Sequence, residues 1–279
     1  MTEKKVFVHD VSICNGCYCC QIACKDEHVG NDWTPIAKPQ PDTGQFWLKQ
    51  HEFVRGTVPK VKMYYRPILC MHCDEAPCMP ACPIEGAIYK RDDGLVIIDP
   101  VKAKGRMEII GTCPYDVIYW NEELSLPQKC TGCAHLMEDG WTETRCSQVC
   151  PTGALKLVLA EDADMAARAK EDGLEAYKAE LGTSPRVWHK NLHRWTKAFV
   201  GGTVAYKDTD ECAEGAVVIL WAQGAKRAET TTNNYGDFIF DNLEPGSYEL
   251  NINAGGYKPV SEKVEVKEST NLGVVLLER

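Results

Sequence analysis

The sequence has no long hydrophobic run and no excess of positive charge. No stretch approaches the roughly 18 uninterrupted apolar residues of a membrane-spanning helix, and the opening MTEKKVFVHD lacks the apolar core of a secretory signal. The formal net charge is −9, whereas nucleic acids and anionic membranes attract basic surfaces. These absences argue against a membrane span, an export signal and a nucleic-acid partner, and we expect a cytoplasmic protein.

Motifs that usually mark a substrate site are missing as well. The sequence contains no nucleophile elbow, no phosphate-binding loop and no dinucleotide-binding fingerprint. Composition is otherwise ordinary for a globular protein, with 44% hydrophobic and 25% charged residues. We therefore predict no catalytic residue in this chain, and any reaction is expected to take place on a partner.

Cysteine is the abundant residue type that needs an explanation. The chain has 15 cysteines, and all but Cys212 fall between Cys14 and Cys150. The cytoplasm keeps thiols reduced, the count is odd, and the spacings are too short for a disulfide framework in a chain with enough apolar residues for a core. Metal binding is the interpretation that these features favour.

The cysteines form four groups with regular spacing. The first is Cys-x2-Cys-x2-Cys-x3-Cys, from Cys14 to Cys24; the second and fourth end in Cys-Pro at Cys82 and Cys150, and the third keeps only Cys113, again before proline. In the bacterial ferredoxin spacing, three thiolates hold one iron–sulfur cube and the fourth ligates its neighbour. We expect the fourth cysteine to begin a helix, since proline is tolerated in a first helical turn.

Glycines and histidines near these motifs have predicted supporting roles. Gly16 and Gly132 should let the backbone approach the sulfurs and offer N–H groups to them. His72 and His135 are expected to hydrogen-bond or pack beside a cluster rather than ligate it. Structural zinc also uses Cys-x2-Cys pairs, but it needs two pairs per ion and no recurring Cys-Pro. We therefore favour iron–sulfur clusters.

The composition divides the chain into three segments. Residues 1–157 are rich in cysteine, proline and glycine and predict a ferredoxin-type iron–sulfur domain; residues 158–198 predict a helical segment and linker. Helical periodicity over 161–182 indicates one or two amphipathic helices with a break at Gly173. In residues 199–279, short runs of Val, Ile, Thr and Tyr between turn residues indicate a small antiparallel β-sandwich of about seven strands. The predicted fold class is α+β.

Several stretches resemble known families. CMHCDEAPCMPACPIEGAIYKRDDGLVIID, CPYDVIYWNEE and QKCTGCAHL resemble the polyferredoxin-type iron–sulfur subunits of molybdopterin oxidoreductases, which belong with dimethyl sulfoxide reductase and formate dehydrogenase. This resemblance extends from residue 5 to about residue 157. GDFIFDNLEPGSYEL, after a Thr-rich strand and before GGY, resembles immunoglobulin-like and transthyretin-like modules of the collagen-adhesin-B and carboxypeptidase-regulatory type.

The first resemblance implies how the motifs share their clusters. Family members cross-link the first motif with the fourth and the second with the third. Carried over to this sequence, that pairing implies three [4Fe-4S] clusters with the following ligands: Cys14, Cys17, Cys20 and Cys150; Cys130, Cys133, Cys146 and Cys24; and Cys70, Cys73, Cys78 and Cys113. The fourth cluster of the family is expected to be absent.

The missing cluster leaves some thiols without a role. In the third motif Ala103, Arg106 and Ile109 stand where the family has ligands. Cys82 is then orphaned and, with Cys19 and Cys212, is expected to serve as small buried apolar packing. An alternative pairing joins motif one with two and three with four. It also yields three clusters, but it uses Cys82 and orphans Cys150.

The family implies a heterodimer with a large catalytic subunit that holds molybdenum or tungsten on two pterin guanine dinucleotides. This chain would then be a non-catalytic electron-transfer subunit. The lost cluster, the missing membrane anchor and the appended sandwich resemble transhydroxylase-type members that act on aromatic polyols. Two alternatives stay open: the iron–sulfur subunit of a catechol or other aromatic dehydroxylase fed by an external donor, and a free-standing polyferredoxin carrier.

Overall fold

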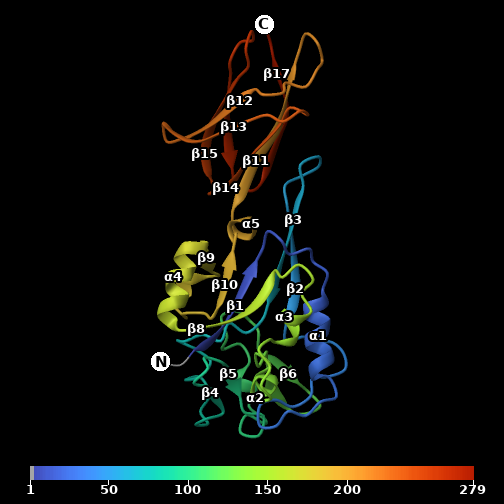
Figure 1. Ribbon diagram of the computed structural model, residues 1–279, viewed down its shortest axis with the longest axis vertical. Helices are drawn as coiled ribbons and strands as arrows, with labels where there is room; N and C mark the ends of the chain where they lie inside the picture. Colours follow the sequence, from blue (N-terminus) through green and yellow to red (C-terminus); the bar gives the residue numbers. More distant parts are fainter. Residues whose placement is uncertain (1–2) are drawn as a thin grey trace. The chain divides into compact units, whose positions relative to one another are not determined.

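The computed structural model describes residues 3–279 and divides into two compact units. The first unit comprises the chain up to residue 52 together with residues 64–192, and the second comprises residues 53–63 and 193–279 (Figure 1). In the described part of the chain, none of the helices combines the length and apolar character that crossing a bilayer requires.

A four-stranded sheet supports one side of the first unit. Its strand order is β8-β1-β10-β9, with β1 parallel to β10 and the outer pairs antiparallel. The strands are β1 (Lys4–Asp10), β8 (Leu155–Ala160), β9 (Leu174–Ala176) and β10 (Val187–Lys190). Helix α4 (Asp162–Asp172) lies beside this sheet (Figure 1). It buries Met165 and Ala169 against Val6 of β1. The sheet therefore joins the first strand of the chain to the segment that follows the last cysteine motif.

The helical prediction for residues 161–182 is confirmed only in its first half. Helix α4 ends at Gly173, which adopts the left-handed conformation with φ +63° and donates its N–H to Ala169 O. Such a cap satisfies a carbonyl that the helix leaves open. A second helix does not follow. Leu174 begins β9, whose pairing with β10 supplies the backbone hydrogen bonds instead, and one 3₁₀ turn, η2 (Ala179–Leu181), completes the segment.

The rest of the first unit consists of loops, short helices and small hairpins around a common core. Its elements are α1 (Cys19–His28), β4 (Ile88–Lys90), β5 (Val96–Ile98), η1 (Met107–Ile109), β6 (Tyr119–Asn121), β7 (Leu126–Gln128), α2 (Ala134–Glu138) and α3 (Arg145–Gln148). Helices α1 and α3 pack against each other. Many of the cysteines belong to the same buried cluster as Trp47, Leu95 and Ile97, so the core of this unit is built largely from the cysteine loops.

The expectation that the fourth cysteine of a motif begins a helix is wrong. Cys24 lies inside α1, which starts at Cys19. Cys113 and Cys150 each begin a turn, in which the N–H of the residue three positions later donates to the cysteine carbonyl at 3.0 and 3.1 Å, respectively. Proline is favoured at the second position of such turns because its φ is already set. The Cys113-Pro114 and Cys150-Pro151 pairs therefore mark turns here.

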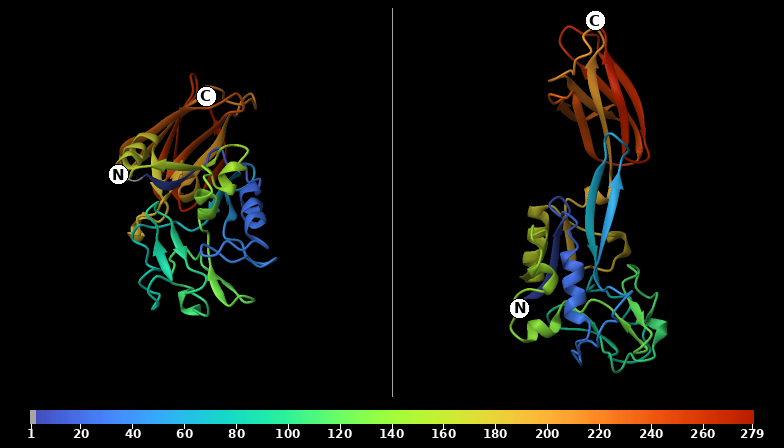
Figure 2. Two further views of the ribbon diagram at one scale, coloured as in Figure 1. Left: turned by 60° about the horizontal axis from the view of Figure 1, so that its bottom comes forward. Right: turned by 90° about the vertical axis from the view of Figure 1, so that its right-hand side faces the viewer.

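The second unit is a β-sandwich of two sheets. The strand orders are β14-β11-β17 and β13-β12-β15-β16, and the sheets can be followed in Figure 2. The strands are β11 (Ala198–Tyr206), β12 (Val217–Ala222), β13 (Ala225–Thr231), β14 (Asp237–Leu243), β15 (Gly246–Asn253), β16 (Val260–Val266) and β17 (Thr270–Leu277). Alternate side chains such as Phe238, Phe240 and Leu250 fill the space between the sheets.

The expected seven strands are confirmed, but the expectation of an entirely antiparallel sandwich is wrong. The first strand, β11, pairs in parallel with the last, β17, from Val200↔Thr270 to Tyr206↔Leu277. Alternation along a single strand reports which face is buried and carries no information about the direction of a distant neighbour. This pairing closes the smaller sheet by joining the two ends of the module.

A hairpin from the cysteine-rich part of the sequence contributes its tip to the second unit. Its strands are β2 (Lys49–Arg55) and β3 (Lys62–Ile68), and residues 53–63 form the tip. Arg55 donates from Nη2 to both carboxylate oxygens of Asp241, at 3.1 and 3.2 Å, and from Nη1 to Lys197 O. Lys60 forms an ion pair with Asp237. The tip is thus fastened to the sandwich by charged pairs.

Candidate iron–sulfur sites

Four thiols from the second and third motifs line one small cavity in the first unit: Cys70, Cys73, Cys78 and Cys113. The pKa of Cys73 is raised to about 12 and that of Cys78 to about 11, first by burial and also by charge on Cys70 and Cys113. Thiols that influence one another in this way stand close together around a shared space. We call this arrangement the inner set.

A second group gathers where α1 meets α3 and is called the middle set. Cys24 comes from α1, Cys146 from α3, and Cys130 and Cys133 from the loop that leads into α2. Burial raises the pKa of Cys24 well above its usual value, and charge on the other three members adds to the effect. Burial also raises the pKa of Cys146, again reinforced by Cys133 and Cys130. All four side chains are buried.

The third group, the outer set, is the most accessible. It brings Cys150 to the first motif, with Cys17 exposed, Cys14 and Cys150 partly exposed and Cys20 buried. Burial raises the pKa of Cys20 to about 12, and charge on Cys14 and Cys150 contributes. The Gln50 amide lies between two of the thiols, with Nε2 3.7 Å from Cys14 Sγ and Oε1 3.5 Å from Cys20 Sγ.

The middle set adjoins both of the other sets. After burial and its own set, the pKa of Cys146 in the middle set is raised by charge on Cys20 of the outer set. After burial, the pKa of Cys130 in the middle set is raised by charge on Cys70 of the inner set, whose backbone also hydrogen-bonds to the Cys130 sulfur. The middle set therefore links the outer set with the inner set.

Backbone N–H groups point at several of the sulfurs. Gly132, His72 and Leu155 donate to the Sγ atoms of Cys130, Cys70 and Cys150, respectively, each at 3.4 Å. Such donors stabilise thiolates and tune the potentials of iron–sulfur clusters.

Two glycines beside the motifs lie where a side chain would not fit. Gly132 has φ +63°, and a Cβ there would lie 2.6 Å from Leu95 Cδ2. Gly16 has φ +67°, and its Cβ would meet the Tyr65 ring at 2.4 Å. Burial raises the pKa of Cys14, and a hydrogen bond from the Gly16 backbone opposes that rise.

The donor sets fit iron–sulfur clusters. Each set offers four thiols from at least two separate chain segments, and backbone N–H groups surround them. Within residues 3–279, no group of three or more His, Cys, Asp or Glu side chains is arranged to hold one metal ion. A cube instead distributes its four ligands over four irons.

Three cysteines belong to none of the sets. The expectation of buried apolar packing is wrong for Cys19, which is exposed and hydrogen-bonds with Cys17, and for Cys212, which is exposed in the second unit. Cys82 is half-buried and packs against the core of the first unit. Ala103 and Ile109, which replace family ligands in the third motif, are fully buried members of the hydrophobic core. Hydrophobic packing thus occupies this part of the first unit.

The two histidines near the motifs make hydrogen bonds. Val96 N–H donates to Nδ1 of the fully buried His72 at 3.0 Å. Nε2 of His135 lies 3.0 Å from Glu27 Oε1, and Arg145 Nε lies 3.1 Å from the other oxygen of the same carboxylate. Trp33 stacks on the His135 ring with centroids 4.2 Å apart.

Sequence reasoning overlooked Gln50, Glu27 and Lys129. Nothing in the order of residues connects Gln50 or Glu27 with a cysteine motif, because both reach their partners only through folding. Lys129 directly precedes Cys130 in the sequence, so its position could have drawn attention to it.

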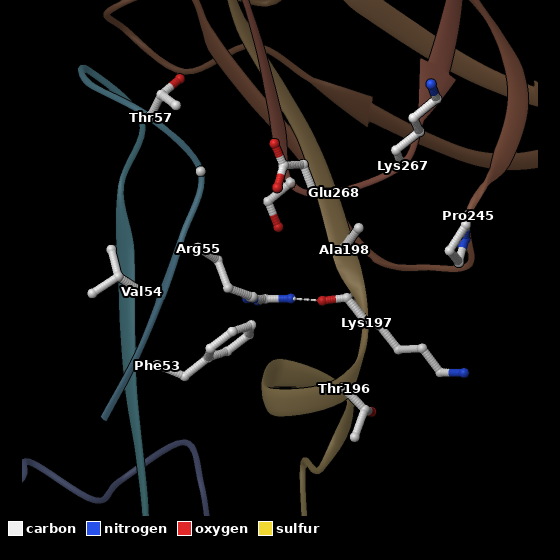
Figure 3. Close-up of a pocket in the computed structure, with 12 residues that line it drawn as sticks. Phe53, Val54, Arg55, Thr57, Thr196, Lys197, Ala198, Pro245, Lys267 and Glu268 are labelled. Carbon is white, nitrogen blue, oxygen red and sulfur yellow. Dashed lines mark hydrogen bonds between the residues drawn. The ribbon is translucent and has the colours of Figure 1, made fainter. Parts of the chain in front are cut away.

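A pocket of about 350 Å³ lies in the second unit, where the hairpin tip meets the sandwich. Figure 3 shows Arg55 pointing across it to Lys197, with Phe53 beside it and Glu268 on the sandwich side. Two of its charged groups form ion pairs: Arg55 with Asp241, and Lys197 with Glu244. The pocket therefore lies at the interface between the hairpin tip and the sandwich.

Comparison with known families covers most of the chain. Residues 61–160 match the family model of the 4Fe-4S dicluster domain, and residues 200–277 match that of the carboxypeptidase regulatory-like domain. The second match agrees with the predicted type of the appended sandwich.

Three curated relatives illustrate the similarity. The chain is 41% identical to the pyrogallol hydroxytransferase small subunit of Pelobacter acidigallici, over 99% of this chain and 100% of the relative. It is 30% identical to the thiosulfate reductase electron transfer subunit of Salmonella typhi, over 71% of this chain and 98% of that one. A probable anaerobic dimethyl sulfoxide reductase chain of Escherichia coli is 34% identical over 56% of this chain and 74% of the relative.

Proposed function

Because the chain belongs to the iron–sulfur subunits of molybdopterin oxidoreductases, we propose that it holds three [4Fe-4S] clusters and carries electrons for a large catalytic subunit. The observation that carries this proposal is the group of three four-cysteine sets, in which the middle set adjoins the other two. When bound, such clusters supply one-electron transfer from one set to the next. Transfer over a long distance needs relay sites at short intervals, which three neighbouring sets supply.

The assignment of ligands follows the pairing of the first motif with the fourth and the second with the third. The proximity of Cys150 to the first-motif thiols supports it, as does that of Cys24 to the fourth motif. The alternative pairing would require Cys82 as a ligand and leave Cys150 without a role. Cys82 instead packs against the apolar core.

The three sets differ in how far they are exposed to solvent. Burial keeps water from the middle set and from Cys70, Cys73 and Cys78 of the inner set, whereas Cys113 is partly exposed; exclusion of water strengthens electrostatic interactions. The outer set is accessible through Cys17, and the exposed apolar side chains of Ile13, Tyr18 and Ile22 flank it. Exposed apolar side chains suit a protein partner, so the outer set is the proposed contact with the large subunit.

The proposed partner is a large subunit with molybdenum or tungsten on two pterin guanine dinucleotides, and the proposed substrates are aromatic polyols. The match to the Pelobacter pyrogallol hydroxytransferase small subunit supports this choice, because it extends through the β-sandwich to 99% of the chain. The match to the thiosulfate reductase relative extends over only 71% of this chain. A cytoplasmic location belongs to the proposal, since fifteen cysteines in a chain of this kind require reducing conditions.

Copurification under anaerobic conditions tests the proposal. We expect the native protein to elute with a large subunit that contains molybdenum or tungsten and a pterin, and the complex to move hydroxyl groups between trihydroxybenzenes without an added donor. A requirement for a low-potential donor would favour the dehydroxylase alternative. Elution as a monomer would favour a free-standing carrier, and a large subunit without pterin would contradict the proposal.

A further inference from the structure

Lys129 is a buried cation without an acidic partner. It follows β7 in the first unit and is 3% exposed. Its Nζ donates to Val96 O and, at 3.2 Å, to Cys130 O. Among residues 3–279, no carboxylate oxygen lies within 4.0 Å of this ammonium. Burying a charge without a counter-ion is costly, so the fold should place negative charge nearby from another source.

Cysteine thiols surround it, and they become negatively charged thiolates when they ligate a cluster. Lys129 lines the inner cavity together with Cys78 and Cys113. Burial raises the pKa of both thiols, and the Lys129 charge opposes that rise. It has the same opposing effect on Cys130 of the middle set. The ammonium therefore lies where the inner and middle sets adjoin.

We infer that Lys129 is the built-in counter-ion of the two buried cluster sites and raises the reduction potential of the cluster held by the inner set. The inference rests on the proposed function, because it needs clusters in these sets. Reduction adds one electron, and hence one negative charge, to a site, while no bond to Lys129 forms or breaks and no proton moves. A nearby fixed cation stabilises the reduced form more than the oxidised form, so electrons would be drawn toward the inner set.

Lys90 provides a matched comparison within the same unit. Its Nζ donates to Cys73 O at 2.8 Å and to His72 O at 3.2 Å, so it too lies beside the inner set. Unlike Lys129, it forms an ion pair with Asp74 at 2.7 Å, and its side chain is 23% exposed. Because a carboxylate and solvent balance this charge, removing it should change the potential of the cluster much less.

The test uses the full-length chain, produced anaerobically, as wild type and as Lys129→Gln, Lys129→Arg and Lys90→Gln. Iron content and the electron paramagnetic resonance signals are measured first, followed by a potentiometric titration of each signal. Glutamine can still donate to the Val96 and Cys130 carbonyls, and arginine keeps the charge, so the two variants separate hydrogen bonding from electrostatics.

We expect Lys129→Gln to shift the reduction equilibrium of one cluster at least tenfold toward the oxidised form, a fall of about 59 mV for one electron. Lys129→Arg and Lys90→Gln should stay within a twofold change. Loss of one cluster from Lys129→Gln but not from Lys129→Arg would also support a counter-ion.

Two results would overturn the inference. One is a fully loaded Lys129→Gln variant with wild-type potentials, and the other is equal cluster loss from Lys129→Gln and Lys129→Arg. If the wild type itself bound no clusters, the proposed function would fail, which is a different outcome.

Discussion

The N–H of Gly132 donates to the Sγ atom of Cys130 across 3.4 Å, at a point where the backbone has φ +63°. The bond forms because the chain turns back on itself between Cys130 and Cys133. An L-residue avoids this left-handed conformation, and the Leu95 side chain fills the space where a Cβ would lie. The left-handed backbone at Gly132 thus directs an N–H group at Cys130, a proposed cluster ligand.

Gly132→Ala should lower the free energy of unfolding by about 2 kcal/mol or more, from left-handed strain plus the clash with Leu95. It should also reduce cluster loading. Gly173→Ala is the control, because Gly173 has the same φ of +63° but no atom within 4 Å of a Cβ. Chemical denaturation and iron content would be compared, and equal effects of the two substitutions would contradict a role for the close packing at Gly132.

Cys150→Ala should remove one cluster, about four iron atoms, because Cys150 completes the outer set. Cys82→Ala should leave iron content unchanged, since Cys82 packs against apolar side chains. Iron determination on anaerobically purified variants provides the measurement. The alternative pairing of motifs predicts the reverse, with loss at Cys82 and none at Cys150.

Arg55→Met should destabilise the second unit by about 2 kcal/mol. Its guanidinium is buried and bonds to Asp241 at 3.1 and 3.2 Å, and removing one partner of a buried pair leaves the other uncompensated. This expected loss of stability is smaller than for a fully buried pair because Asp241 is partly exposed. Thermal unfolding would be followed alongside Lys226→Met, which breaks the exposed Lys226–Glu229 pair and should change little. Equal effects would contradict the proposed fastening of the hairpin tip.

Stability of the first unit should fall on mild acidification because of His9. Burial, reinforced by the Arg66 charge and opposed by Asp10, lowers the pKa of His9 to about 3. Between pH 6.5 and about 3 the unfolded chain therefore binds a proton that the folded chain does not, so stability decreases as pH falls. The expected slope is up to about 1.4 kcal/mol per pH unit.

Denaturation of wild type and His9→Phe at several pH values between 5 and 7.5 would test this. In His9→Phe the free energy of unfolding should change less with pH, because the contribution of His9 is absent. A contribution from His189 remains, because burial and the neighbouring Arg66 and His9 keep the pKa of His189 well below its usual value. Cluster absorbance recorded at each pH separates protonation of His9 from cluster loss. An unchanged slope in the variant would contradict the prediction.

Local patterns in the sequence predicted the features that depend on neighbouring residues. The helix that ends at Gly173 and the alternation around Phe238 and Phe240 both follow from a few adjacent positions. The resemblance to a known family supplied the cysteine pairing, which no local pattern contains.

Features that depend on residues far apart in the sequence could not be predicted from local patterns. The parallel pairing of β11 with β17 and the place of the tip residues 53–63 in the second unit depend on folding of the whole chain. The same holds for Gln50, which reaches Cys14 and Cys20 from β2. Cys113 and Cys150 begin turns because proline fits a turn as well as it fits a first helical turn.

The proposal of three clusters is tested by determination of iron, sulfide and zinc in the anaerobically purified full-length chain. We expect about twelve iron atoms, a matching amount of sulfide and no stoichiometric zinc, since three sets of four thiolates would each hold a four-iron cluster. Stoichiometric zinc, about eight iron atoms, or about sixteen would contradict it.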